Sequence, residues 1–129
     1  MAADNNKEVV RRFLEEVLAS GKLDQIDELL APGYVNRAFG VGLEAFKGML
    51  AGLSAALPDR RFDVEDLVAE GDAVVARYTS EMRDRSGKTT SVRGLTFYRL
   101  AGGKIVEDDP ITTPDLAQAL GPLLGSPPA

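Results

Sequence analysis

The segment GGKIVEDDPITT, residues 102–113, places a glycine turn before an apolar strand that runs into two adjacent aspartates. Strand interiors are normally depleted in Asp, because its short side chain competes with the backbone for hydrogen bonds. The chain contains no His and no Cys. Proton transfer would therefore fall to Asp, Glu, Tyr or Lys, and Asp108 and Asp109 are the carboxylates in the most strand-like setting.

Three further strands are expected upstream of this segment. Apolar residues recur in runs that are separated by turns at Gly71-Asp72, at the polar run 83–88 and at residues 101–103. This pattern is typical of strands that are joined by hairpins. The expected strands cover residues 62–68, 73–82, 89–100 and 104–109 or beyond.

Helices are expected at both ends of the chain. Three N-terminal segments carry apolar residues at helical spacing, namely Asn6–Ala19, Leu23–Leu30 and Leu43–Leu57. Gly21 would end the first helix. Thr113-Pro114-Asp115 resembles an N-cap, a proline at the first helical position and an acidic first turn, which predicts a short helix from Pro114 to about Leu120. Residues 125–129 are expected to form a loose tail.

Helices that are segregated from hairpin-linked strands predict an α+β fold. The 129 residues suit one domain that spans the chain 1–129. A strongly curved sheet can pack one face against helices and enclose an apolar pocket. We therefore expect a layered fold with a ligand cavity inside it.

The composition narrows the possible partners. The formal net charge of -5 argues against nucleic acid or an anionic membrane as the main partner. The lack of Cys and His excludes disulfides, zinc-thiolate sites and imidazole-based triads. The N-terminus lacks the apolar core of a signal peptide, and no apolar run is long enough to cross a membrane. We expect a cytoplasmic protein that uses no cofactor and no metal.

Four stretches of the sequence match the pattern of a known protein family. They are NKEVVRRF at 6–13, GKLDQIDELLAPGYV at 21–35, VEDLVAEGD at 64–72 and GKIVE at 103–107. In these stretches the chain resembles the SnoaL-like polyketide cyclase family of the nuclear transport factor 2-like superfamily. The resemblance covers nearly the whole chain. It implies a cone-shaped curved antiparallel sheet packed against three N-terminal helices, with a short C-terminal helix. It also implies a homodimer and a hydrophobic small-molecule substrate.

The last strand departs from the family pattern. Much of the family carries Glu-His-Trp-Asp after the Gly-Lys-Ile-Val motif, whereas this chain has Glu107-Asp108-Asp109-Pro110. Asp108 therefore stands at the usual His position, and Pro110 stands at the usual Asp position. The region after Tyr34 often carries Asp-His, and here it is Asn36-Arg37. The acid/base set of the family has been changed.

A second resemblance is local. Relatives similar to limonene-epoxide hydrolase hold a water with a Tyr-x-Asn pair and a last-strand Asp, and add an Arg-x-Asp on a middle strand. Tyr34-Val35-Asn36 is similar to the first pair. Arg77-Tyr78-Thr79 keeps the Arg but has Thr in place of the Asp.

The same resemblance implies which side chains face the pocket. If Arg77 faces inward, Thr79 and Glu81 share its side of the strand. Asp108 would face inward as well, with Asp109 outward. Pro110 cannot donate a ladder hydrogen bond, so a bulge or a strand end is expected there. Such a bulge could turn Asp109 inward, which leaves the choice between the two aspartates open.

We therefore predict an enzyme that closes a ring in a polyketide-like molecule, or isomerises such a molecule, by carboxylate acid/base catalysis. The alternatives are an epoxide hydrolase or epoxide-opening cyclase, and a ligand-binding module without catalysis. The catalytic candidates are Asp108, Asp109 and Arg77. The substrate-binding candidates are Tyr34, Asn36, Phe46, Leu50, Thr79, Glu81 and Val92. Several also have a structural interpretation. Asp108 and Asp109 could be a solvated pair that ends a strand before a proline turn, and Arg77 could be a surface or interface residue held by Glu81 or Asp84. Tyr34 and Asn36 could close the loop after the second helix, and Phe46 and Leu50 could be core.

Overall fold

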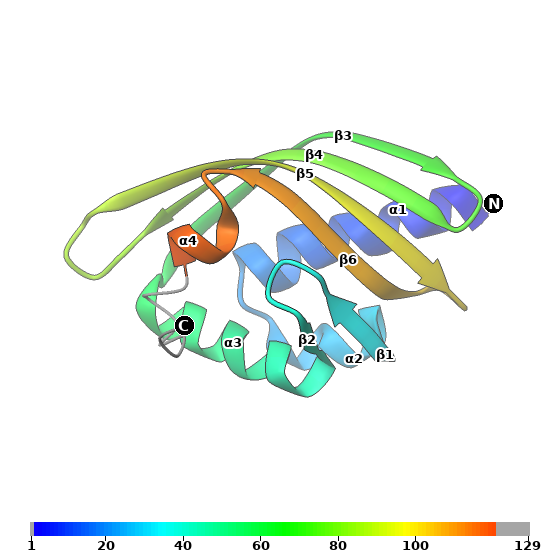
Figure 1. The fold of residues 1–129 in the computed structure, drawn as a ribbon, viewed down its shortest axis with the longest axis horizontal. Helices are drawn as coiled ribbons and strands as arrows, with labels where there is room; N and C mark the ends of the chain where they lie inside the picture. Colours follow the sequence, from blue (N-terminus) through cyan, green and yellow to red (C-terminus); the bar gives the residue numbers. More distant parts are fainter. Residues whose placement is uncertain (1, 121–129) are drawn as a thin grey trace.

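A computed structural model of the chain describes residues 2–120. The expected tail at 125–129 lies outside these residues. Helices cover the concave face of a curved sheet of six strands, and a short helix follows the last strand (Figure 1). This is the α+β cone predicted from the sequence. No helix in the described part of the chain is long and apolar enough to span a membrane.

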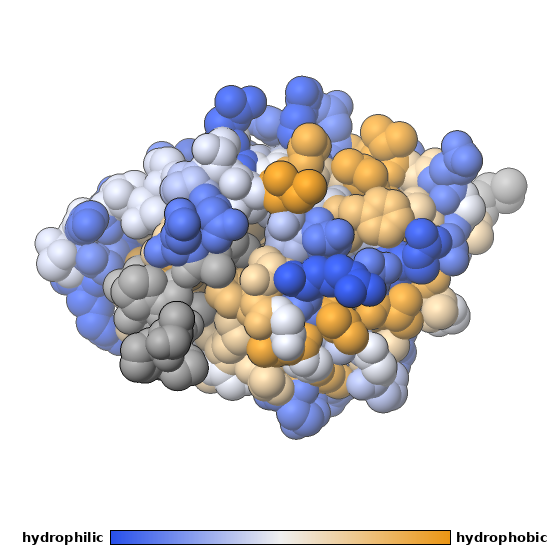
Figure 2. All heavy atoms as spheres, in the orientation of Figure 1, coloured by the Kyte–Doolittle hydropathy of each residue, from blue (hydrophilic) through white to orange (hydrophobic). Residues whose placement is uncertain are grey.

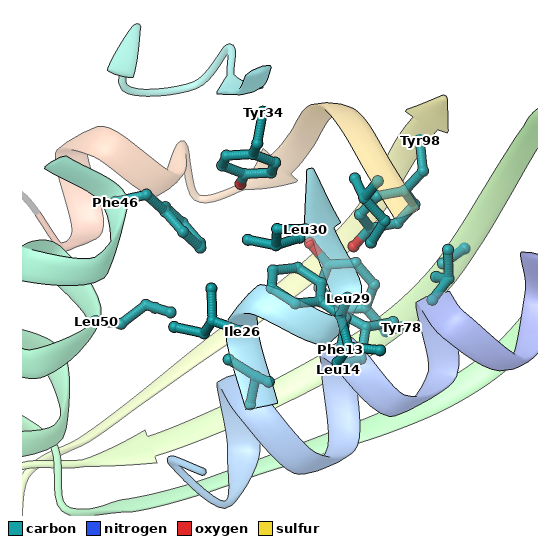
Figure 3. Close-up of a cluster of buried hydrophobic side chains, with 14 of the residues drawn as sticks. Phe13, Leu14, Ile26, Leu29, Leu30, Tyr34, Phe46, Leu50, Tyr78 and Tyr98 are labelled. Carbon is teal, nitrogen blue, oxygen red and sulfur yellow. The ribbon is translucent and has the colours of Figure 1, made fainter. Parts of the chain in front are cut away.

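The first helix changes its winding halfway. The α-helix α1 (Ala2–Arg12) continues into a π-helical segment, η1 (Phe13–Ala19), which Gly21 follows at a φ of +72°. Phe13, Leu14 and Val17 of the π-helical segment are buried. The Phe13 ring packs against the rings of Phe46 and Tyr98, at centroid distances of 6.1 and 6.2 Å (Figure 3). This segment therefore links the helical layer to the sheet.

The predicted second helix is shorter than expected. A 3-10 turn, η2 (Leu23–Gln25), leads into α2 (Ile26–Leu29). The chain then becomes extended in β1 (Leu30–Asn36), makes a turn, and forms β2 (Val41–Gly42) before helix α3 (Leu43–Ala56). The helix predicted over Leu23–Leu30 thus ends at Leu29, and Leu30 begins a strand instead.

The four long strands form the antiparallel meander that the sequence predicts. They are β3 (Asp59–Glu70), β4 (Ala73–Arg83), β5 (Thr89–Ala101) and β6 (Lys104–Thr113). The sheet order is β2-β1-β6-β5-β4-β3, and β1 lies parallel to β6. The sheet is therefore mixed rather than purely antiparallel. Since β1 adjoins β6, residues from the first third of the chain lie beside the acidic end of the last strand.

A β-bulge in β6 decides which of its side chains point inward. The β5–β6 register passes from Leu100↔Ile105 to Arg99↔Glu107, so Val106 is the extra residue. Ile105 and Asp108 are both buried although they are three residues apart. Strict alternation would place them on opposite faces, and the bulge removes that conflict. The bulge lies before Asp108, not at Pro110 as expected.

Pro110 stays within the strand because its nitrogen is not needed in the ladder. The Arg37 N–H donates to the carbonyl oxygen of Asp108 at 2.8 Å, so the backbone polar groups of Asp108 point toward β1. The backbone nitrogen of Pro110, two residues later, points to the same side. Since β1 ends at Asn36, which pairs with Asp108, no strand lies there to accept a hydrogen bond from residue 110. Pro110 pairs with Thr96 in regular register. The predicted interruption at Pro110 is therefore wrong.

The C-terminal helix α4 (Leu116–Leu120) begins later than predicted. The Asp115 carboxylate accepts a hydrogen bond from the Gln118 N–H at 3.1 Å. Asp115, rather than Thr113, therefore has the contact of an N-cap residue.

Candidate active site

Asp108 is the buried carboxyl of the sheet interior. Its side chain points from β6 toward the helices and is 4% exposed. The Tyr34 hydroxyl donates to Asp108 Oδ2 at 2.7 Å. Burial raises the pKa of Asp108 to about 7, the Tyr34 hydrogen bond lowers it, and the charge of Asp109 raises it. A carboxyl with such a pKa can both accept and return a proton near neutral pH.

Tyr34 and Asn36 approach Asp108 from the neighbouring strand. Both side chains are buried, and β1 lies parallel to β6 with Asn36 in register with Asp108. Asn36 Nδ2 donates to the Tyr34 hydroxyl at 3.3 Å. The Asn36 side-chain oxygen accepts from the backbone N–H groups of Ala38 and Phe39, at 2.9 and 3.1 Å. These contacts fix the amide, and the hydrogen bonds then run from Asn36 through Tyr34 to Asp108.

The Tyr34 phenol keeps its proton in this setting. Burial raises the pKa of Tyr34 above its ordinary value, and the Asp108 charge and hydrogen bond raise it further. Its ring packs on that of Phe46 at a centroid distance of 5.0 Å. Tyr34 can therefore act as a stationary donor that orients the carboxyl group.

Asp108 lines a largely apolar cavity between the helices and the sheet. Asn36, Phe39 and Pro110 line it near Asp108. Most other lining residues are apolar and come from α3 and the strands, among them Phe46, Met49, Leu50, Phe62, Met82 and Val92. The structure therefore places the predicted Phe46, Leu50 and Val92 around one cavity with Asp108 and Asn36. Figure 3 shows the labelled Phe46 and Leu50 side chains on the same side of the buried cluster as Tyr34. Tyr34 is buried but is not among the residues that line the cavity.

Several hydroxyl groups face the cavity that sequence reasoning did not single out. Tyr98 lies directly opposite Asp108 in the β5–β6 ladder. The Tyr78 and Thr96 hydroxyls share a hydrogen bond of 2.9 Å, and Ser80 also lines the cavity. Burial raises the pKa of Tyr78 to about 12 and that of Tyr98 well above its ordinary value. Both phenols therefore remain potential donors at neutral pH.

The prediction that Arg77, Thr79 and Glu81 face the pocket is wrong. Arg77 has a side chain that is 56% exposed and forms ion pairs with Asp66 and Glu65 on the outer face of the sheet. Glu81 lies on the same face and accepts a hydrogen bond from Arg61 at 3.2 Å. The intervening residues of β4 point inward instead. The sequence contains the signal for this orientation of β4, because every second residue on the inward side except Ser80 is apolar. The apolar residues, all buried, are Val74, Ala76, Tyr78 and Met82.

Asp109 does not belong to the cavity. It pairs with Phe97 across the β5–β6 ladder, next to the Tyr98–Asp108 pair, and so projects to the other face of the sheet. It is also not among the residues that line the cavity. Of the two aspartates that the sequence left open, the structure places Asp108 inside.

The fold and the cavity define a class of small cone-shaped α+β proteins that enclose a pocket between helices and a curved sheet. The model of the SnoaL-like domain matches residues 10–108, and the chain belongs to this family. Its fold is that of nuclear transport factor 2-like proteins. No curated protein matches the chain.

Solved structures from several bacteria share this fold. A proposed polyketide cyclase from Acidithiobacillus ferrooxidans is 27% identical with a TM-score of 0.75, and the match covers 95% of this chain and 96% of the other. A proposed SnoaL-like polyketide cyclase from Jannaschia sp. CCS1 is 23% identical with a TM-score of 0.75, over 98% and 96% of the two chains. An LEH-like epoxide hydrolase from M. tuberculosis is 17% identical with a TM-score of 0.77, over 98% and 96%.

Proposed function

We propose that this protein is a cofactor-independent cyclase or isomerase that acts on a hydrophobic, polyketide-like molecule, with Asp108 as its acid/base group. The observation that carries the proposal is a buried carboxyl with a pKa of about 7 at the wall of an apolar cavity. Family membership and the similarity to proposed polyketide cyclases support the same class of reaction.

The site favours a reaction in which one group removes and returns the proton. Among the described residues that line the cavity, Asp108 is the one acidic side chain, and none is basic. In an aldol-type ring closure, Asp108 takes a proton from the carbon next to a carbonyl. The resulting enolate carbon forms a bond to a second carbonyl carbon, whose π bond breaks. The alkoxide oxygen then takes the proton back from Asp108, so the product is an isomer of the substrate.

The surrounding hydroxyls suit the charge that develops in this reaction. The enolate and the alkoxide both place negative charge on oxygen, and protonated phenols can donate to it. Tyr98 is one candidate, because it lines the cavity and lies opposite Asp108 in the β5–β6 ladder. The apolar walls from α3 would hold the substrate folded, and orientation of the reacting carbons lowers the barrier further.

The proposal is tested by proton exchange at a carbonyl probe. We expect the protein to accelerate exchange of the α-protons of 2-tetralone in D₂O, followed by NMR. The rate should rise as pH passes through about 7, because the carboxylate form of Asp108 is the base. Asp108→Asn should remove the acceleration. Asp109→Asn, which changes the neighbouring carboxyl outside the cavity, should keep most of it.

Two outcomes would oppose the proposal. Unchanged exchange in Asp108→Asn would assign the chemistry to another group. Binding of 2-tetralone by the wild type without exchange at any pH would favour the ligand-binding module that the sequence left as an alternative.

A second candidate is epoxide opening, by water or by an internal hydroxyl. It is favoured by the contact of Tyr34 with both Asn36 and Asp108, at 3.3 and 2.7 Å, a set of groups able to hold a water. The outward position of Arg77 weakens the case for epoxide opening. The epoxide hydrolases that the chain resembles use an Arg-x-Asp pair on a middle strand to position the acid, and Arg77 does not enter the cavity here. Hydrolysis of styrene oxide in the wild type, with loss in Tyr34→Phe and in Asn36→Ala, would support this reaction over isomerisation.

We also propose that the protein is a homodimer that works in the cytoplasm. Leu95, Val75 and Ile111 are exposed on the outer face of the sheet, with Ile111 at 75%. Figure 2 shows hydrophobic side chains next to hydrophilic ones on the side of the molecule drawn there. A face with apolar residues and charges of both signs suits a self-complementary twofold contact. Light scattering should give a dimer for the wild type and a monomer for Ile111→Asp, and fractionation of the native cells tests the compartment.

A further inference from the structure

Ser80 carries a buried hydroxyl that forms no hydrogen bond with any described residue. The residue is 2% exposed and lines the cavity. Its cross-strand neighbours are Phe62 on β3 and Val92 on β5, both apolar. Buried hydroxyls are normally hydrogen-bonded, so an unpaired one that faces a cavity points to a missing ligand group.

We infer that Ser80 is the centre of a second polar subsite, which binds an oxygen at the far end of the molecule whose other end meets Asp108. This inference deepens the proposed function, since it takes the Asp108 end as the reacting end. It divides the cavity into two polar ends that are separated by apolar walls.

The register of the sheet shows how far apart these ends lie. Asp108 pairs with Tyr98, and Tyr98 pairs with Val74 on β4. Ser80 is six residues further along β4, which is roughly 20 Å of extended strand. Curvature of the sheet brings the two side chains closer than this, because both point toward the concave side. The ligand that spans them is therefore elongated.

A further pair of hydroxyls lies between the two ends. Tyr78 and Thr96 hydrogen-bond to each other at 2.9 Å, and both line the cavity. Two hydroxyls have two protons, and their mutual bond uses one of them. The remaining proton can be donated to an oxygen in the middle of the ligand. The polar groups thus form a line of Asp108, the hydroxyl pair and Ser80.

The chemistry of this line indicates the class of ligand. No lysine or arginine is among the described residues that line the cavity. A carboxylate or phosphate at the Ser80 end would therefore lack a compensating charge. Hydroxyl and carbonyl groups suit Ser80, because a serine hydroxyl can donate or accept. The ligand is a neutral, elongated apolar molecule that carries oxygen at both ends.

The test compares two series of simple probes. Linear α,ω-alkanediols of increasing length are titrated against the protein by ligand-observed NMR, each beside the 1-alkanol of equal length. We expect the diol to bind more tightly than the alcohol at one range of lengths, by about five- to tenfold, the value of one net hydrogen bond. Ser80→Ala should remove this preference. Ser91→Ala, which removes a hydroxyl from the exposed side of β5, should retain it.

Each result decides the inference. A diol preference that survives in Ser80→Ala, or no diol preference at any length, would overturn it. Thermal melts of Ser80→Ala show whether the variant folds, and loss of the preference counts only in the folded variant. Should Ser80→Ala not fold, Ser80→Cys replaces the hydroxyl with a thiol, which is only a weak hydrogen-bond donor, and an undiminished diol preference in that variant would overturn the inference. The probes report binding alone, so the outcome is separate from that of the exchange assay on Asp108.

Discussion

The Asp108→Asn variant is expected to be more stable than the wild type at neutral and alkaline pH. Asp108 is buried in an apolar cavity, and its carboxylate form is desolvated there. Asparagine has nearly the same shape and has no charge to desolvate. Its side-chain oxygen can still accept the hydrogen bond that the Tyr34 hydroxyl donates to Asp108. The substitution therefore removes the cost of the charge while it keeps the main contact.

The magnitude follows from the pKa of Asp108. Folding raises this pKa from 3.8 to about 7, mainly by burial. A change of one pKa unit corresponds to about 1.4 kcal/mol, so the buried charge costs about 4 kcal/mol once Asp108 is fully ionised. Between pH 4 and pH 7 the folded protein holds this proton more tightly than the unfolded chain. The stability of the wild type relative to the variant therefore falls as pH rises through this window, and it is constant above it.

Urea unfolding at a series of pH values from 4 to 9 measures this difference. The free energies of unfolding of the wild type and Asp108→Asn should be close at pH 4 and should diverge by up to about 4 kcal/mol at pH 8. Asp109→Asn provides the matched control, because the Asp109 charge makes the smallest of the three contributions to the pKa of Asp108. A difference between wild type and Asp108→Asn that does not change with pH would refute the reasoning.

Three further predictions follow from the positions of single side chains. Tyr34→Phe removes a hydrogen bond that lowers the pKa of Asp108, so the midpoint of the pH–rate profile for 2-tetralone exchange should move to higher pH. Gly94→Ala should reduce the free energy of unfolding by about 1–3 kcal/mol in urea titrations, because its Cβ would lie 2.6 Å from the Tyr78 ring, and the penalty should shrink in a Tyr78→Ala background. Arg77→Ala should leave exchange unchanged and alter stability by less than about 1 kcal/mol, since its ion pairs are exposed.

The strands and helices were predictable where local signals act alone. Gly21 takes a positive φ at the end of the first helix, as its position suggested. The hairpin turns of the meander lie where the polar and glycine residues place them, so β4 and β5 match their predicted ranges within a residue at each end. These features depend on neighbours in sequence, which explains why the sequence reveals them.

The phase of β4 shows where a resemblance misled the prediction. The resemblance to epoxide hydrolases predicted that Arg77 faces the cavity. The residues of this strand that are buried are instead Val74, Ala76, Tyr78, Ser80 and Met82. Ser80 interrupts the apolar pattern with a polar residue, which weakened the alternation as a signal. Burial of apolar area decides the phase, because a slip by one residue would expose every one of these side chains.

The position of Asp108 could not be derived from local sequence, because it depends on two features of strand pairing: the bulge at Val106 and the parallel pairing of β1 with β6. Alternation from the buried Ile105 would turn Asp108 outward, and only the extra residue at Val106 reverses this. The parallel pairing of β1 with β6 then brings Tyr34 to the carboxyl group. A bulge is set by the register of two strands rather than by one of them.

The same arrangement explains how a chain without histidine could move a proton near neutral pH. An exposed aspartate is ionised at pH 7 and is a weak base, because its ordinary pKa is 3.8. Burial raises the pKa of Asp108 to about 7, and it does so at the expense of stability. The Tyr34 hydroxyl opposes this rise, so that the carboxylate form is still populated at neutral pH. A buried carboxyl with a single phenolic donor thus approaches the pKa of an imidazole, which is the property that the proposed acid/base role of Asp108 requires.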